Sequence, residues 1–248
     1  MTIPSGNKKR NYILMKNYIK LPVVYLIVLF AGTLLISSCS EDKEYYSVGD
    51  FLVSFGVVEQ SNANQEKNLV VRLDNGDKAV SLITLPNWVE FETGQRVLIN
   101  FAPYEDKMNA DSSKNYYGKF NKIQNILYKD ILSGSAINND SIGNDPIMIN
   151  KTWLTGDSIL NVQFSFYTQG SKHYVNLIDL GEGDGVVKPY VFEFRHNDRD
   201  DIHGYPASGY VSFKLNPIKV EGQHEVDFNI RYTDYEGKTT VIPHKINY

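Results

Sequence analysis

Apolar and polar residues alternate along most of the chain after residue 47, and this period of two constrains the fold more than any other feature. In 158–167, for example, Leu160, Val162, Phe164 and Phe166 alternate with polar residues. Such alternation places every second side chain on one face of a β-strand. We find no convincing amphipathic helix and no internal repeat. The sequence therefore predicts an all-β protein, and its 17 tyrosines and 12 phenylalanines favour strands as well.

Five strands are expected in the first half of the chain, at 50–59, 68–74, 78–84, 95–102 and 116–128. In the first of them, Phe51, Val53, Phe55 and Val57 fall on one face. Asn75-Gly76 lies between the second and third strands and is a strong β-hairpin motif, because both residues tolerate positive φ. Five strands with one long irregular connection fit an N-terminal OB-like barrel.

Seven strands are expected in the second half, at 147–154, 158–167, 172–180, 188–196, 210–215, 225–232 and 239–246. This number of short strands predicts an immunoglobulin-like β-sandwich. The stretch before them, 133–146, is rich in Gly, Ser, Asn and Asp, as linkers are. We therefore place an OB-like barrel domain with its linker at 47–142 and a seven-stranded sandwich domain at 143–248.

The N-terminus has the composition of a removed secretory signal peptide. It carries five basic residues and no acidic one before Glu41, followed by an apolar run over 21–36. That run is shorter than the roughly 20 residues that a membrane-spanning helix needs. Met1 and Met15 are both possible starts, because the segment from Met15 is itself a compact leader. We expect residues 1–38 to be cleaved, although an uncleaved anchor helix is the alternative.

Cys39 follows the apolar run and is the only cysteine in the chain, so it has no intramolecular disulfide partner. Ile36-Ser37-Ser38-Cys39 resembles a lipobox, which predicts lipidation of Cys39 and a lipidated tether over 39–46. The acidic residues at 41–44 resemble a surface-export motif of Bacteroidetes lipoproteins, although a solvated tether explains them equally well. The expected location is the outer membrane, facing the periplasm or the cell surface.

The mature chain would be acidic. Five of the 25 basic residues and none of the 29 acidic residues lie in the leader, which leaves a net charge of about −9. Nucleic-acid affinity comes largely from phosphate neutralisation by Lys and Arg. A nucleic-acid partner is therefore not expected.

Several segments together resemble the NigD-like lipoproteins of Bacteroidetes. These segments are 153–162, 173–177, 194–197 and 209–213, in that order after the lipobox and the barrel. The resemblance covers essentially the whole mature chain and implies an OB-like domain, a C-terminal β-sandwich and an envelope location. The family takes its name from a bacteriocin-associated locus. It has no agreed catalytic residues, so the resemblance carries none to this chain.

The densest polar cluster in the sequence is 195–203, which contains His196, Asp198, Asp200 and His203. Imidazole and carboxylate groups suit a divalent metal such as zinc. The spacing matches no metal motif, however, and Arg195 and Arg199 are interleaved with the acids. His196 is also in phase with the apolar residues of its strand, which predicts a hydrogen-bonded residue at a strand end. We expect no metal and no cofactor.

Other chemistry is weakly supported. The segment 181–185 contains three glycines and two acids with the wrong spacing for calcium, so it is read as a turn. No G-x-S-x-G motif is present, which argues against a serine hydrolase. The barrel segment does contain many aromatic residues, which on an OB-fold could bind glycans: Phe51, Phe55, Trp88, Phe91, Phe101, Tyr104, Tyr116 and Tyr117.

The sequence therefore predicts a non-enzymatic envelope lipoprotein that binds a protein or envelope partner through exposed strand edges or loops. A glycan-binding accessory lipoprotein that uses the aromatic face of the barrel is the alternative, and a hydrolase without a recognisable motif comes third. The residues that would bind a ligand cannot be named from the sequence.

Overall fold

The computed structural model describes residues 49–60, 68–83, 85, 90–138, 142–156, 158–181, 189–215, 218 and 224–247. In these ranges the chain forms strands β1–β14 and one short 3-10 helix, η1 (Gly134–Asn138), and no helix there is long and apolar enough to cross a membrane. The expected leader, Cys39 and the tether up to residue 46 lie outside the described residues. The all-β prediction is confirmed.

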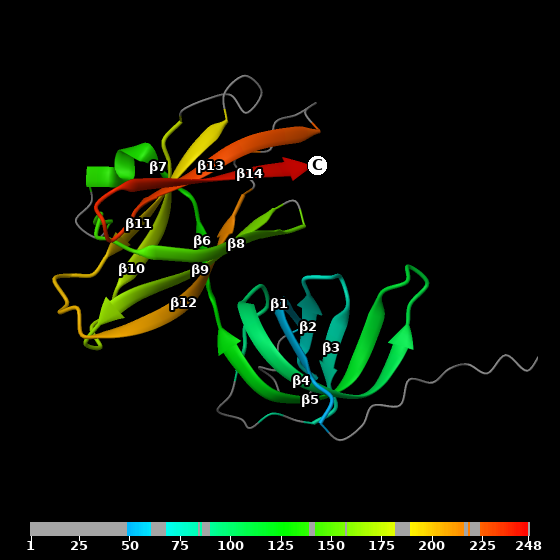
Figure 1. Cartoon of the computed structure of the whole chain (residues 1–248). Helices are drawn as coiled ribbons and strands as arrows, with labels where there is room; N and C mark the ends of the chain where they lie inside the picture. The colour runs from blue at the N-terminus through cyan, green and yellow to red at the C-terminus, as the bar shows by residue number, and fades with distance from the viewer. Residues whose placement is uncertain are drawn as a thin grey trace, which may run out of the picture. The chain divides into compact units, whose positions relative to one another are not determined.

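The first five strands close into a barrel with the order β1-β2-β3-β5-β4 (Figure 1). They are β1 (Leu52–Gln60), β2 (Val70–Leu73), β3 (Lys78–Ser81), β4 (Arg96–Met108) and β5 (Lys114–Asn125). β1 is antiparallel to both β2 and β4, whereas β3 and β5 run parallel. The predicted small five-stranded barrel is therefore confirmed.

The core of the barrel is formed by side chains that alternate along its strands. Val71 and Leu73 of β2 are buried, as are Val97, Ile99 and Phe101 of β4. Phe101 packs edge-on against Phe120 of β5, with ring centroids 4.8 Å apart. The period-two pattern of these strands therefore identified the inward face correctly.

β1 shows the opposite outcome. Phe51, Val53 and Phe55 share one face, as predicted, but that face points out of the barrel, and Phe51 and Val53 are each 60% exposed. The inward face of β1 instead carries Gly56 and Val58, which are buried. Alternation alone could not distinguish the two faces, because both carry apolar residues.

The hairpin between β2 and β3 forms where Asn75-Gly76 predicted it. Gly76 has φ +92° and its amide donates to the carbonyl of Leu73 at 3.0 Å, while Leu73 N donates to Asp77 O at 2.7 Å. Only Gly76 adopts positive φ in this turn; Asn75 does not. The loop is therefore the three-residue kind with a left-handed residue at its end, rather than a two-residue mirror-image turn.

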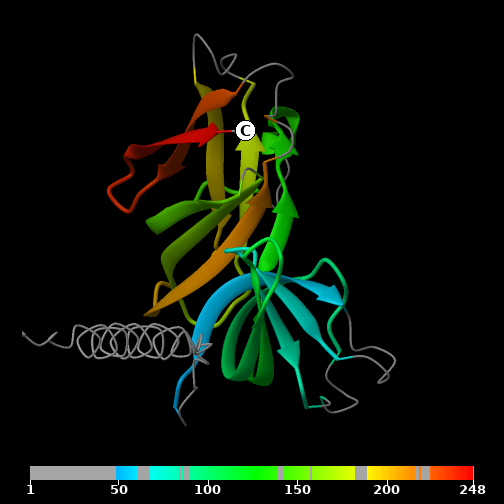
Figure 2. The same cartoon turned by 90° about the vertical axis from the view of Figure 1, so that its right-hand side faces the viewer.

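The remaining nine strands form two sheets, with the orders β14-β13-β11-β10-β7 and β6-β12-β9-β8. Their bounds are β6 (Leu127–Asp130), β7 (Leu132–Ser133), β8 (Met148–Thr155), β9 (Ile159–Thr168), β10 (Tyr174–Asp179), β11 (Tyr190–Asn197), β12 (Tyr205–Lys214), β13 (Glu225–Thr233) and β14 (Thr239–Asn247). All seven strands predicted for the sandwich are present, and β6 and β7 are added to them. Figures 1 and 2 show the sheets from two sides.

The predicted strand 116–128 is wrong in its second part. β5 ends at Asn125, and after the buried Ile126 the chain continues as β6, which pairs in parallel with β12 instead of with the barrel. β7 likewise pairs with β10. The chain therefore changes sheets at Ile126, earlier than the boundary expected near residue 143. The apolar alternation runs through this point, so the sequence pattern did not mark it.

The sandwich core lies between the two sheets. Phe164 of β9 and Phe213 of β12 come from one sheet, and Phe194 of β11 comes from the other. The Phe164 and Phe194 ring centroids are 5.9 Å apart, and those of Phe194 and Phe213 are 6.1 Å apart. These rings, together with buried Val, Leu and Ile side chains, join the sheets by apolar burial.

Candidate binding site

His196 was the central member of the possible metal cluster, and it is buried at the end of β11, with 2% of its surface exposed. Its Nδ1 is 3.1 Å from the carbonyl oxygen of Pro146, and its Nε2 is 2.9 Å from Nδ1 of His173. Both ring nitrogens therefore have partners in the protein. His196 is a hydrogen-bonded residue at a strand end, as its phase with Phe192 and Phe194 suggested.

The other three candidates do not join His196. His203 Nε2 is 3.4 Å from Asp198 Oδ2, and the His203 side chain is 52% exposed. Asp198 Oδ1 accepts the amide of Asp200 at 2.9 Å, which closes a local turn. Across the described residues, no group of three or more His, Cys, Asp or Glu side chains is placed to hold a metal ion.

A buried polar chain continues from His196 through His173 to Asp201. His173 Nε2 is 3.1 Å from Asp201 Oδ2, and that oxygen also accepts Thr168 Oγ1 at 2.6 Å and the amide of Gln169 at 2.9 Å. These hydrogen bonds, led by the one from Thr168, hold the pKa of Asp201 well below its usual value. Burial lowers the pKa of His196. The sequence did not identify this chain, because 23 and 28 residues separate its members.

The loop after β11, residues 198–204, is fixed by this chain and is locally strained. Arg199 and Asp200 have φ of +57° and +60°, a region that non-glycine residues seldom adopt. Asp198 N donates to Asp145 Oδ2 at 2.8 Å, and Asp201 N donates to Asp198 O at 3.2 Å. Strain of this kind persists only where surrounding contacts enforce it, and it is concentrated at functional sites.

Four exposed or half-buried side chains lie at this loop, and we call them the loop cluster: Tyr167, Ile202, His203 and Tyr235. The ring centroids of Tyr167 and Tyr235 are 5.3 Å apart, and His203 lies 6.2 Å from Tyr167 and 6.1 Å from Tyr235. Tyr205 is exposed as well, but it pairs with Thr168 and therefore points to the other side of the sheet from Tyr167. Ile202 is 66% exposed.

Hydrogen bonds to the backbone hold the loop cluster in place. The hydroxyl of Tyr235 accepts the backbone amide of Tyr167 at 3.2 Å, and partial burial raises the pKa of that phenol. Asp201 fixes the loop backbone next to Ile202 and His203. Tyrosine is enriched at protein interfaces, because a large rigid ring gives contact area at low cost in conformational entropy. The arrangement suits recognition of a partner surface more than acid–base chemistry.

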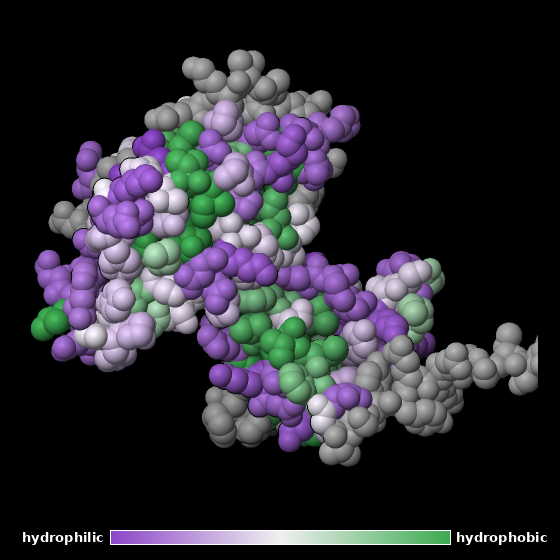
Figure 3. Space-filling model, viewed as in Figure 1, coloured by the Kyte–Doolittle hydropathy of each residue, from purple (hydrophilic) through white to green (hydrophobic). Residues whose placement is uncertain are grey.

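The predicted aromatic face of the barrel is not assembled as one surface. Phe91 and Phe101 are buried in the barrel core. Phe55 packs against Trp153 and Tyr210, with ring centroids 5.3 Å away in both cases. Of the described aromatic residues in the barrel segment, Phe51 and Tyr104 are the exposed ones, and Trp88 lies outside the described residues. Figure 3 shows that hydrophobic side chains nevertheless reach the barrel surface.

An open polar cleft of about 1070 Å³ lies beside the buried Arg96. Its lining includes Asp74, Glu92, Thr155 and Lys214. Arg96 is already bonded to Asp74, and Lys214 is 3.0 Å from Asp130. Arg96 and Lys214 are therefore paired with carboxylates of the protein itself.

The glycine-rich segment 181–185 is described only at Gly181, and the rest lies outside the described residues. Gly181 has φ +65°, and its amide donates to Asp179 Oδ1 at 2.8 Å. These features of Gly181 fit a turn after β10. The turn predicted for the rest of the segment stays a prediction.

Comparisons with known proteins identify the family. A family model described as the NigD-like C-terminal beta sandwich domain matches residues 130–245. A crystal structure from Parabacteroides distasonis, provisionally described as a toxin-related protein, is 32% identical with a TM-score of 0.62, over 80% of this chain and 94% of that one. No curated protein matches the chain.

Two more distant crystal structures share the fold. A NigD-like immunity protein from Bacteroides caccae is 15% identical, and a provisionally described lipoprotein from Bacteroides fragilis is 9% identical. Each has a TM-score of 0.55 over 80% of this chain, and the alignments cover 93% and 98% of those chains. The similarity to the Parabacteroides protein and the match to the domain model lead to one conclusion: the chain belongs to the NigD-like family.

Proposed function

We propose that this chain is a non-enzymatic lipoprotein of the outer membrane that binds a protein partner through the loop cluster. The observation that carries the proposal is the ring contact of Tyr167 and Tyr235 with His203, which lies on a strained loop held by the buried His196–His173–Asp201 chain. A rigid aromatic surface of this kind loses little entropy on binding.

The membrane anchor rests on the sequence. Cys39 is the only cysteine, and it follows an apolar run of about 16 residues. Metabolic labelling with a fatty acid tests this part directly. Label should enter the wild-type protein and be absent from Cys39→Ser, whereas label in the variant would refute lipidation at Cys39.

The bacteriocin-associated locus that gave the family its name points to a protein as the partner. The Parabacteroides relative carries a toxin-related description, which is compatible with a proteinaceous partner. Glycan recognition by the barrel has less support, because only two of its described aromatic residues, Phe51 and Tyr104, are exposed and the others are buried or half-buried. A hydrolase would need convergent catalytic groups in a pocket. The cleft beside Arg96 instead holds an Arg96–Asp74 pair.

The test is a pull-down from detergent-solubilised envelopes, with intact lipoprotein as bait. The wild type should retain a specific protein that the double variant Tyr167→Ala, Tyr235→Ala loses. Val241→Ala is the matched control, because Val241 is exposed on β14 of the same sandwich. Capture that survives the double variant would place the binding surface elsewhere.

A glycan array probed in parallel separates the alternative. Binding to an array glycan that Phe51→Ala or Tyr104→Ala abolishes would favour glycan recognition by the barrel. A silent array together with loop-cluster-dependent protein capture would exclude glycan binding as the main role.

A further inference from the structure

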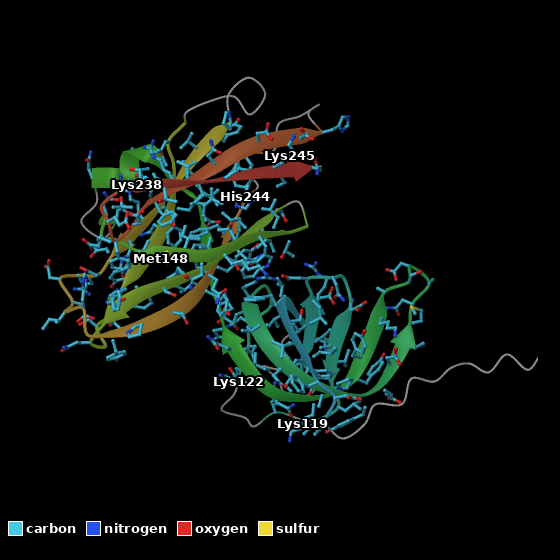
Figure 4. All side chains as sticks on the ribbon, viewed as in Figure 1. Lys119, Lys122, Met148, Lys238, His244 and Lys245 are labelled. Carbon is cyan, nitrogen blue, oxygen red and sulfur yellow. The ribbon has the colours of Figure 1, made fainter. Side chains whose placement is uncertain are left out.

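One outer face of the barrel combines exposed apolar side chains with exposed lysines. Phe51 directly before β1, Val53 of β1 and Tyr104 of β4 each have more than half of their surface exposed. β5 contributes Lys119 and Lys122, which are also exposed. We call these five residues the barrel face. Figure 4 shows the two lysines close together on the barrel.

The strand register places Val53 and both lysines on one side of the sheet. Val53 pairs with Asn100, and Asn100 pairs with Lys122, so the three form one cross-strand row. Ala102, two residues along β4, pairs with Lys119. Directly paired residues in antiparallel strands point to the same side of the sheet. Val53, Ala102 and both lysines therefore share the outer surface, and Phe51 is two residues before Val53.

The lysines have no carboxylate partner among the described residues. The ion pairs described for the barrel lysines involve Lys78 with Glu59 and Lys114 with Asp106, not Lys119 or Lys122. Asp50 and Glu105 also border the barrel face. The local charge is therefore mixed, and the exposed apolar side chains define the surface, with the lysines at one side of it.

We propose that the barrel face lies in the headgroup layer of the phospholipid bilayer that holds the lipid anchor. This inference rests on the proposed lipidation of Cys39. Phe51 is the twelfth residue after Cys39, and a chain of that length spans at most about 40 Å even when fully extended. The barrel face begins at the end of this tether, so the anchor would hold Phe51 within about 40 Å of the lipid.

The residue types fit that position. Aromatic rings are favoured at the membrane interface, because they have an apolar body. Lysine can lay its carbon chain along apolar surface while its ammonium group reaches the lipid phosphates. One lipid anchor combined with a second contact orients a protein more firmly than the anchor alone.

The chain offers a clean test. Its natural cysteine is blocked when lipidated, so a cysteine introduced elsewhere can be labelled alone. Val53→Cys carries an environment-sensitive fluorophore on the barrel face. Val241→Cys is the matched control, because Val241 is a 53% exposed valine on β14 of the sandwich. The lipidated proteins are reconstituted into phosphatidylethanolamine–phosphatidylglycerol vesicles and separated by flotation.

The fluorophore at residue 53 should shift to shorter wavelength on the vesicles, and that at residue 241 should not. Flotation without a shift at residue 53 would overturn the barrel-face proposal and leave the lipid anchor intact. Failure to float would refute the anchor, and with it the barrel-face contact. An equal shift at both positions would overturn the assignment of the contact to this face.

Charge reversal tests the lysines. Lys119→Glu with Lys122→Glu should reduce the shift at residue 53. Lys238→Glu with Lys245→Glu makes the same change of net charge on the sandwich, where both lysines are labelled in Figure 4, and should leave the shift unchanged. An equal effect of both pairs would show that total charge, and not the barrel face, controls the contact.

Discussion

Arg96 and Asp74 form a bidentate ion pair in which the arginine is fully buried. Arg96 donates through Nη1 and Nη2 to the two carboxylate oxygens of Asp74, with Nη2–Oδ2 at 2.6 Å. Arg96 Nη2 also donates to Asn161 Oδ1 at 2.9 Å, and Thr155 Oγ1 donates to Asp74 Oδ2 at 2.7 Å. One charged pair is therefore bonded to residues of both β8 and β9.

Replacing Asp74 by Ala should destabilise the protein strongly. The variant leaves the buried guanidinium of Arg96 without its counter-charge, and breaking a buried pair in this way costs about 3–5 kcal/mol. Urea denaturation followed by tryptophan fluorescence measures the free energy of unfolding. Glu225→Ala is the control, because it removes an exposed ion pair with Lys245 and should change little. A loss no larger than that of the control would show that Arg96 does not depend on Asp74.

The stability of the protein should rise with pH through the range in which histidine titrates. Burial lowers the native pKa of His196 and His244, so below pH about 6.5 the unfolded chain takes up protons that the native state does not. Stability is therefore complete above pH about 6.5 and falls as the pH drops toward the native pKa values. Each histidine contributes a slope of up to about 1.4 kcal/mol per pH unit.

Denaturant midpoints at several pH values between 5 and 7.5 measure this slope, a window that lies above the usual carboxylate range. His196→Gln and His244→Gln should each flatten the curve. An unchanged slope in both buried-site variants would assign the pH dependence to other groups.

Gly118 is required for β4 and β5 to approach each other. A Cβ at this position would lie 2.0 Å from the carbonyl oxygen of Ala102 and 2.9 Å from Cα of Pro103. Because both neighbours are backbone atoms, Gly118→Ala should force the strands apart and cost about 3 kcal/mol. Gly76→Ala is the comparison: it has open space but φ +92°, so it should cost only about 1–2 kcal/mol. The reverse order of melting temperatures would contradict this explanation.

The sequence predicted the strands better than the contacts between them. All seven sandwich strands were located, because each has one apolar face and a turn on either side. The pairing of β6 with β12 was missed, since it depends on where residues 127–130 meet 211–214. The outward face of β1 was missed for a related reason: Phe55 is apolar because it packs on Trp153 and Tyr210, not because it lies in the barrel core.

The candidate site was harder to predict than the fold. Local sequence singled out 195–203, and His203 does belong to the loop cluster. The supporting partners His173, Thr168 and Pro146 lie far from that segment in the sequence. Neither hydrogen-bond pairs nor ring contacts between distant strands leave a periodic pattern. The strained φ of Arg199 and Asp200 also had no sequence marker, such as glycine, to reveal it.

The last prediction concerns how Asp201 holds the binding loop. Asp201→Asn keeps the size of the side chain but replaces a carboxylate that accepts hydrogen bonds from Thr168 and Gln169 and lies 3.1 Å from His173. The weakened network should release residues 198–204, because their strained backbone needs these contacts. Amide hydrogen exchange in this loop should become faster while exchange in β12 stays slow. Capture of the partner in the pull-down should fall as well.

Asp200→Asn is the matched control for this variant. It makes the same chemical change one residue earlier, at a position where φ is +60° and asparagine is well tolerated. Its loop should exchange at the wild-type rate and its partner binding should be unchanged. If both variants behave alike, Asp201 does not organise the loop. If Asp201→Asn frees the loop but partner capture is unaffected, the loop is ordered by Asp201 but the partner binds another surface.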